Sequence, residues 1–257
     1  MEIDEHITAL RREGGLLSAA VDGLSPHAPV PSCPGWTVRD LLRHTGMVHR
    51  WARSYVADAL TVPRVDNDTP DVGPLPADAD LVGWFRNGHT LLVDTLASAP
   101  ADLACWTFLP TPGSPLAFWA RRQAHETTIH RIDAELAATG TCDGVGPTFA
   151  ADGIDELIRG FLGRPGRTAP SGPPWSLSVV TADTHEQWYL QVRPDGRSTR
   201  HTTGNAAGDA RPGDCRVRGT ASDLYLALWN RISTNDLDVT GDRSVLERWR
   251  ETIKITW

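Results

Sequence analysis

The chain has 257 residues, of which 40% are hydrophobic and 22% are charged, and its formal net charge is -7. This composition is typical of a globular protein, and we expect two domains at this length. The acidic balance gives no electrostatic reason to expect a nucleic-acid partner. Arginine supplies all the basic side chains except Lys254, a bias that we associate with high-GC bacterial coding sequences.

The first half of the chain predicts a helical bundle. Thr37 and Asp40 fit a capping box at the start of a helix, and Gly140 is placed to end one. The proline-rich stretch at 61–77 predicts a long surface loop. Apolar residues recur at helical spacing in four segments, at residues 4–24, 37–60, 78–97 and 116–139. Four helices with long connections favour a bundle, which often holds metal sites between its helices.

After Gly140 the pattern changes. A short helix is predicted at 152–162, and a linker rich in glycine and proline follows at 163–174. Helical spacing returns at 221–231, and alternating patterns predict strands at 175–180, 187–193 and 215–219. We therefore predict an α+β protein, with a helical bundle over residues 1–162 and a small α+β domain over residues 175–257.

Glu126 and His130 are the most informative pair for chemistry. Four residues apart on a predicted helix, they share one face with Cβ atoms about 5–6 Å apart, so both reach a single metal ion. A third ligand must come from another helix, and His44 is the best candidate for an open site of catalytic type. The competing interpretation is that Glu126 and His130 form an exposed, hydrogen-bonded pair on the surface of the helix, and that His44 is a histidine of the core.

A zinc-protease motif is excluded by spacing. His125 and Glu126 precede His130 in a pattern similar to H-E-x-x-H, but the two histidines are five residues apart. The second is then turned by about 140° from the first. We expect His125 on another face, and we expect His49, His89 and His125 at the surface or around the ligands.

The cysteines predict neither a zinc knuckle nor a disulfide framework. The four cysteines are scattered without a C-x-x-C pair: Cys33, Cys105, Cys142 and Cys215. We therefore expect all four to be free thiols, and we expect none on the helix face that carries the ligands. The first residues lack the basic and apolar regions of a secretory signal, and no apolar run approaches about 18 residues. We therefore expect a cytoplasmic protein without a membrane span.

Three motifs in order, Pro34–His44, Trp119–Asp133 and Gly219–Arg231, resemble the mycothiol-dependent maleylpyruvate isomerase family of actinobacteria. The resemblance covers most of the chain. It implies a DinB-like four-helix bundle that binds a divalent metal, usually taken as zinc, followed by a smaller α+β domain. Matching the family's metal motif selects His44, Glu126 and His130. The resemblance also implies mycothiol as the thiol cosubstrate.

The expected function is a metal-dependent, mycothiol-using transferase or isomerase, in which an activated thiol attacks a small electrophile. A non-catalytic metal-binding or ligand-binding protein and a hydrolase that uses metal-bound water remain alternatives. Arg231 is expected to anchor an anionic substrate group through its guanidinium. Arg122 and Asp133 are expected either to orient ligands or substrate, or to be solvated helix charges. We expect a monomer or a small homo-oligomer.

Overall fold

The chain is α+β, as predicted, and it divides into two compact units, Met1–Asp143 and Gly144–Trp257. A computed structural model describes residues 1–64, 75–109, 113–163, 172–204 and 213–252. Most of the predicted loop at 61–77 and of the predicted linker at 163–174 lies outside these residues. Each unit is therefore described by itself.

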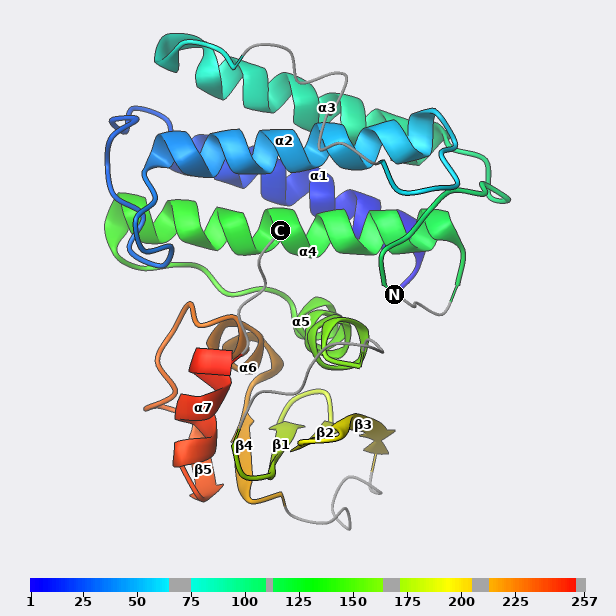
Figure 1. Cartoon of the computed structure of the whole chain (residues 1–257). Coiled ribbons are helices and arrows are strands. Elements are labelled where there is room, and N and C mark those ends of the chain that lie inside the picture. Colours follow the sequence, from blue (N-terminus) through cyan, green and yellow to red (C-terminus); the bar gives the residue numbers. More distant parts are fainter. Residues whose placement is uncertain (65–74, 110–112, 164–171, 205–212, 253–257) are drawn as a thin grey trace. The chain divides into compact units, whose positions relative to one another are not determined.

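The first unit is a four-helix bundle (Figure 1). A short 3-10 turn at Asp78–Asp80 precedes the third helix. The helices are α1 at Ile3–Ala20, α2 at Val38–Ala57, α3 at Leu81–Ser98 and α4 at Pro115–Thr139. Helix α1 packs against α3 and α4, and α2 packs against the same two helices, so the four close around a common interior. The predicted bundle is confirmed.

Capping residues fix where α2 begins and where α4 begins and ends. The Thr37 side chain accepts the Asp40 N–H, and the Asp40 carboxylate accepts the Thr37 N–H, which completes the predicted capping box. The Asp40 carboxylate also accepts the Thr37 hydroxyl at 2.6 Å, and this hydrogen bond, together with the one from the Thr37 N–H, lowers the pKa of Asp40. At the start of α4 the Ser114 side chain accepts the Ala117 N–H, and Gly140 ends this helix with a φ of 75°. Interactions between residues close in sequence therefore help to define the two helices that carry the candidate ligands.

Helix α4 is buried on nearly all of its surface. Its buried residues include nine polar ones: Arg122, Gln123, His125, Glu126, Thr127, Thr128, His130, Arg131 and Asp133. Polar groups removed from water must find partners inside the protein, because leaving them unsatisfied costs free energy. This concentration of buried polar side chains makes α4 the first candidate for the location of a functional site.

The loop between α1 and α2 is anchored to the bundle. Val30 lies in the apolar cluster that also contains Leu17 and Phe85. The Val30 N–H donates to the Trp36 carbonyl at 2.9 Å, and a β-bridge joins Pro29 to Thr37. The loop is therefore a fixed part of the bundle, and it can hold side chains against α4.

The second unit contains a five-stranded mixed sheet of order β3-β2-β1-β4-β5. Strand β1 pairs in parallel with β4 and antiparallel with β2, while β3 and β5 are antiparallel to their neighbours. The strands are Trp175–Thr181, Glu186–Arg193, Gly196–Thr203, Cys215–Gly219 and Asp238–Gly241. Its helices are α5 at Pro147–Asp155, continued by a π-helical turn at Glu156–Phe161, α6 at Ala221–Leu228 and α7 at Ser244–Thr252.

The second unit differs from the prediction in two respects. Strands β1, β2 and β4 were predicted, whereas β3, β5 and α7 were not; β3 is polar throughout, and its pairing with β2 defines it. The units divide between Asp143 and Gly144, earlier than the predicted end of the bundle at residue 162. The reason is that α5 packs against α6. Helical spacing shows that a segment is a helix, but not which partner it packs against.

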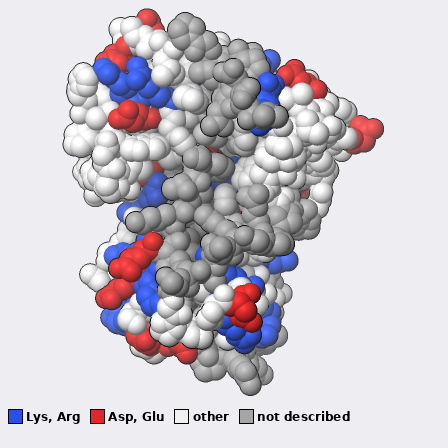
Figure 2. All heavy atoms as spheres, viewed as in Figure 1, with Lys and Arg blue, Asp and Glu red and all other residues white. Residues whose placement is uncertain are grey.

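None of the described helices is long and apolar enough to cross a bilayer. On the face drawn in Figure 2, blue basic and red acidic side chains of the described residues occur in mixed groups.

Candidate metal centre

His44 of α2 and Glu126 and His130 of α4 converge in the first unit. Glu126 Oε1 lies 3.2 Å from His44 Nε2 and 3.3 Å from His130 Nε2. One donor atom from each residue lies within 4.8 Å of the other two. The side chain of His44 is 20% exposed, whereas those of Glu126 and His130 are 5% and 8% exposed. The group is therefore mostly buried and is open to solvent at His44.

Glu126 is held as an anion by its surroundings. Its other oxygen, Oε2, accepts a hydrogen bond of 3.1 Å from Arg122 Nη2, one helical turn earlier. Burial alone would raise the pKa of Glu126, but hydrogen bonds from His130 and His44 and the Arg122 charge hold that pKa well below its ordinary value. A charged carboxylate is available as a ligand in this interior.

His130 is oriented by Asp133. His130 Nδ1 donates to Asp133 Oδ2 at 2.9 Å, because a carboxylate only accepts, and Nε2 then faces Glu126. Burial favours the neutral ring, but the hydrogen bonds to Asp133 and Glu126 raise the pKa of His130 to about 9. Asp133 is fully buried and also accepts from Ser32 Oγ at 2.6 Å and Cys33 Sγ at 3.3 Å. Cys33 therefore reaches the carboxylate that orients His130, and the expectation that no cysteine shares the ligand face stays a prediction.

Trp36 covers both imidazoles from the loop that precedes α2. Its ring centroid lies 4.9 Å from that of His44 and 5.9 Å from that of His130, and it stacks on His130 at an interplanar angle of 22°. The sequence pattern indicated no specific role for Trp36, Ser32 or Cys33. The available signals were their position just before the cap of the helix that carries His44 and, for Trp36, its place in the motif Pro34–His44.

The donor set fits a divalent metal. Two imidazole nitrogens and one carboxylate oxygen are the protein ligands of one common type of catalytic zinc site. Ligand atoms about 2.1 Å from a tetrahedral zinc ion lie about 3.4 Å from one another. The distances of 3.2 and 3.3 Å around Glu126 Oε1 agree with this geometry.

Asp133 adds the carboxylate that usually supports a metal-binding histidine. The buried contacts of Arg122 and Asp133 favour their interpretation as orienting groups over solvated charges.

His49, His89 and His125 are buried, so of the two predicted positions, at the surface or around the ligands, the surface position is excluded. His49 Nε2 lies 2.8 Å from Thr127 Oγ1, and His89 Nε2 lies 2.9 Å from the Leu10 carbonyl. The ring of His125 lies 6.0 Å from that of His6, consistent with a face other than that of Glu126 and His130. Burial lowers the pKa of His49 well below its ordinary value.

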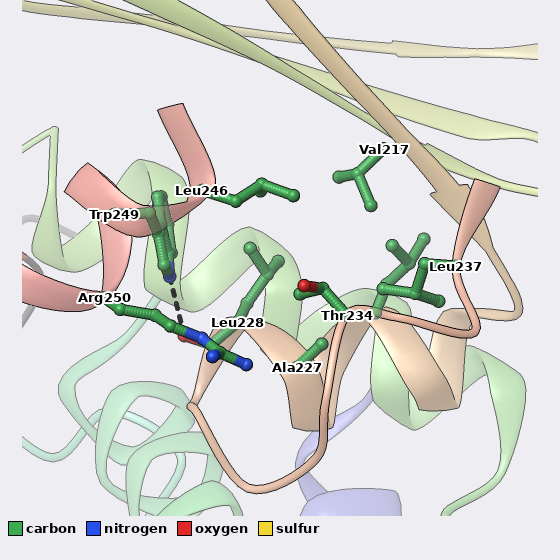
Figure 3. A pocket seen from close by; sticks show the side chains of 9 residues that line it. Val217, Ala227, Leu228, Thr234, Leu237, Leu246, Trp249 and Arg250 are labelled. Atoms are coloured by element: carbon green, nitrogen blue, oxygen red, sulfur yellow. Dashed lines mark hydrogen bonds between the residues drawn. The ribbon is translucent and has the colours of Figure 1, made fainter. Parts of the chain in front are cut away.

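Arg231, the predicted anion anchor, belongs to the second unit. Its Nη1 donates to the Trp229 carbonyl at 2.7 Å, and its role toward a substrate stays a prediction. This unit also contains an apolar cavity between β4, α6 and α7, lined by residues such as Val217, Leu246 and Trp249 (Figure 3). Its volume of about 10 Å³ is room for roughly one water molecule, so it is no substrate pocket.

Family models match both units. Residues 7–135 match the mycothiol maleylpyruvate isomerase N-terminal domain, and residues 148–248 match the MDMPI C-terminal domain. The chain belongs to the mycothiol maleylpyruvate isomerase family. This membership confirms the resemblance found in the sequence, and the two matched domains correspond to the two compact units.

Solved structures share the fold of this family member. A crystal structure of the mycothiol-dependent maleylpyruvate isomerase matches with 13% identity over 93% of each chain and a TM-score of 0.61. A histidine-to-alanine mutant of that isomerase matches with 15% identity, the same coverage of 93% and a TM-score of 0.60. At these identities the likeness establishes the fold alone. Among curated proteins, none matches the chain.

Proposed function

We propose that this chain is a metal-dependent enzyme that uses mycothiol to act on a small electrophile, with isomerisation of maleylpyruvate as the first candidate reaction. The observation that carries the proposal is the convergence of His44 Nε2, Glu126 Oε1 and His130 Nε2 within 4.8 Å. Membership of the mycothiol maleylpyruvate isomerase family supports the choice of thiol and substrate.

His44, Glu126 and His130 would hold the divalent metal, with zinc as the expected ion. A cation bound there lowers the pKa of a thiol and so favours the thiolate near neutral pH. With the metal bound, Asp133 would hold the Nδ1 proton of His130 and so leave the Nε2 lone pair for the metal. Trp36 presents an apolar surface beside both imidazoles.

The expected chemistry is reversible addition. The sulfur of mycothiol adds to one carbon of the substrate's double bond. The former double bond is then a single bond, and the substrate can rotate about it. The carbon–sulfur bond breaks again, the double bond returns in the trans form and the thiol is regenerated. A substrate carboxylate needs a cationic partner, and Arg231 is our candidate because a guanidinium binds a carboxylate through two parallel N–H groups. In a transfer reaction the carbon–sulfur bond would remain.

The test is turnover by zinc-loaded protein with maleylpyruvate, with and without mycothiol. Isomerisation that requires mycothiol supports the proposal. A second assay with monochlorobimane detects thiol transfer, in which the conjugate accumulates. Turnover without any thiol would instead indicate a hydrolase, and metal binding without turnover in either assay would indicate a binding protein.

A variant of the ligands distinguishes loss of the metal from loss of the fold. The double variant His44→Ala with His130→Ala should lose both metal and turnover while it keeps its helical circular dichroism, because a bundle derives most of its stability from apolar packing. Elemental analysis gives the metal content. Metal at the wild-type level in this variant would contradict the ligand assignment.

A further inference from the structure

The two carboxylate oxygens of Glu126 have different partners. Oε1 lies between the Nε2 atoms of His44 and His130, at 3.2 and 3.3 Å. Oε2 accepts a hydrogen bond of 3.1 Å from Arg122 Nη2. One oxygen therefore faces the metal donors, and the other faces a guanidinium on the same helix.

Arg122 is in a position to hold this arrangement. It lies four residues before Glu126, so the two side chains meet on one face of α4, and both are buried, with 1% and 5% of their side chains exposed. A guanidinium remains charged in such surroundings and has a rigid geometry, unlike a lysine ammonium. Moving Oε2 away from Arg122 would leave a buried charge without this partner, which is costly.

We propose that Arg122 is a positioning residue that restricts Glu126 to metal binding through Oε1 alone. The inference rests on the metal site of the proposed function and adds its coordination mode. Carboxylates bind metals through one or both oxygens. With Oε2 engaged by Arg122, the protein contributes three donor atoms, and a fourth position stays open for the thiol. If Glu126 bound through both oxygens, its second oxygen would take up that position.

Arg131 provides a matched control on the same helix. It is also buried, but its guanidinium pairs with Glu13 Oε2 and Glu135 Oε2, both at 2.7 Å, and neither of these is a candidate ligand. Replacing either arginine with methionine removes one buried positive charge from α4. Only the replacement of Arg122 removes the partner of Glu126 Oε2.

The experiment measures coordination directly in the full-length protein. X-ray absorption of the zinc-loaded wild type should show a one-oxygen carboxylate. In Arg122→Met, Glu126 should bind through both oxygens, so the visible absorption of the cobalt-loaded protein should weaken as the ligand number rises. The affinity for zinc should change by about 10–100-fold, the usual effect of losing an outer partner of a ligand. Arg122→Lys should fall between the two, and Arg131→Met should keep the wild-type spectrum.

Two results would overturn the inference. One is a two-oxygen carboxylate in the zinc-loaded wild type, which needs no variant and so does not depend on how well Arg122→Met folds. The other is a wild-type cobalt spectrum in folded Arg122→Met or Arg122→Lys. Both differ from a failure of the proposed function, in which wild-type protein binds no zinc at all and the inference falls with the site.

Discussion

Asp133 joins two parts of the sequence that lie a hundred residues apart. Its carboxylate accepts hydrogen bonds from Ser32 and Cys33 of the loop before α2 and from His130 of its own helix. Four lone pairs are available on a carboxylate, so all three donors are accommodated. The loop and the ligand are therefore fixed by the same buried group.

Replacement of Asp133 should weaken metal binding. Asp133→Asn keeps the shape but loses the charge that holds the Nδ1 proton of His130, so zinc affinity should fall by about 10–100-fold. Competition with a chromophoric chelator measures this change. Glu135→Gln is the matched control, because Glu135 contacts Arg131 and not a ligand. Equal zinc affinities in the two variants would show that Asp133 does not support metal binding.

The cysteines should be dispensable for turnover if mycothiol is the nucleophile. Serine at Cys105, Cys142 or Cys215 should leave turnover and metal content unchanged. Cys33→Ser should behave in the same way, because a hydroxyl can also donate to Asp133. The assay is thiol-dependent turnover, followed for each single variant beside its metal content. Loss of turnover in one of them at normal metal content would mean that the protein uses its own thiol.

At the scale of elements, two glycines allow α3 to approach its neighbours closely. A Cβ on Gly14 of α1 would lie 2.2 Å from the ring of His89, and a Cβ on Gly46 of α2 would lie 2.2 Å from the ring of Trp84. Both rings belong to α3. His89 has little room to move, because it is buried and its Nε2 is hydrogen-bonded to the Leu10 carbonyl.

Adjacent glycines of α1 should therefore respond in opposite directions to alanine. Gly14→Ala should lower the free energy of unfolding by about 1–3 kcal/mol, the usual cost of overpacking. Gly15 has open space around its Cβ position, and Gly15→Ala should raise that free energy by up to about 1 kcal/mol through helix propensity. Urea titrations of both variants test this pair. A Gly14→Ala protein as stable as Gly15→Ala would show that the contact with His89 relaxes freely.

At the scale of the whole molecule, buried histidines make stability depend on pH. Burial lowers the pKa values of His49 and His89 below the value of about 6.5 expected when unfolded. Between about pH 6.5 and 5 the unfolded chain therefore binds more protons than the folded chain, so stability falls as the pH falls. His130 has the opposite shift, to about 9, and its contribution is complete below pH 6.5 and is lost as the pH rises through 9.

The pH dependence can be assigned with one substitution. His89→Gln retains a donor for the Leu10 carbonyl but cannot titrate, so this variant should lose less stability than the wild type between about pH 6.5 and 5. The slope should differ by at most about 1.4 kcal/mol per pH unit. Urea titrations in the presence of a chelator, at several pH values, give both curves. Parallel curves would show that His89 titrates alike in the folded and unfolded chains.

The candidate ligands could be selected from the sequence because their key contact is local. Glu126 and His130 are one turn apart, and any helix at this position brings them together. His44 required the packing of α2 against α4, which spacing suggested and the family resemblance supported. The contacts of Asp133 with Ser32 and Cys33 could not be predicted, since no periodic pattern relates a loop to a helix a hundred residues later.

The same distinction holds for the fold. The four helices of the bundle, the capping box at Thr37 and the end of α4 at Gly140 were predictable from local sequence, because these depend on neighbours within one or two turns. Tertiary structure decided that β3 is a strand, that His49 and His89 are buried and that α5 belongs to the second unit. Each of these depends on a partner distant in sequence, and hydrophobic periodicity identifies the face that is buried without identifying what buries it.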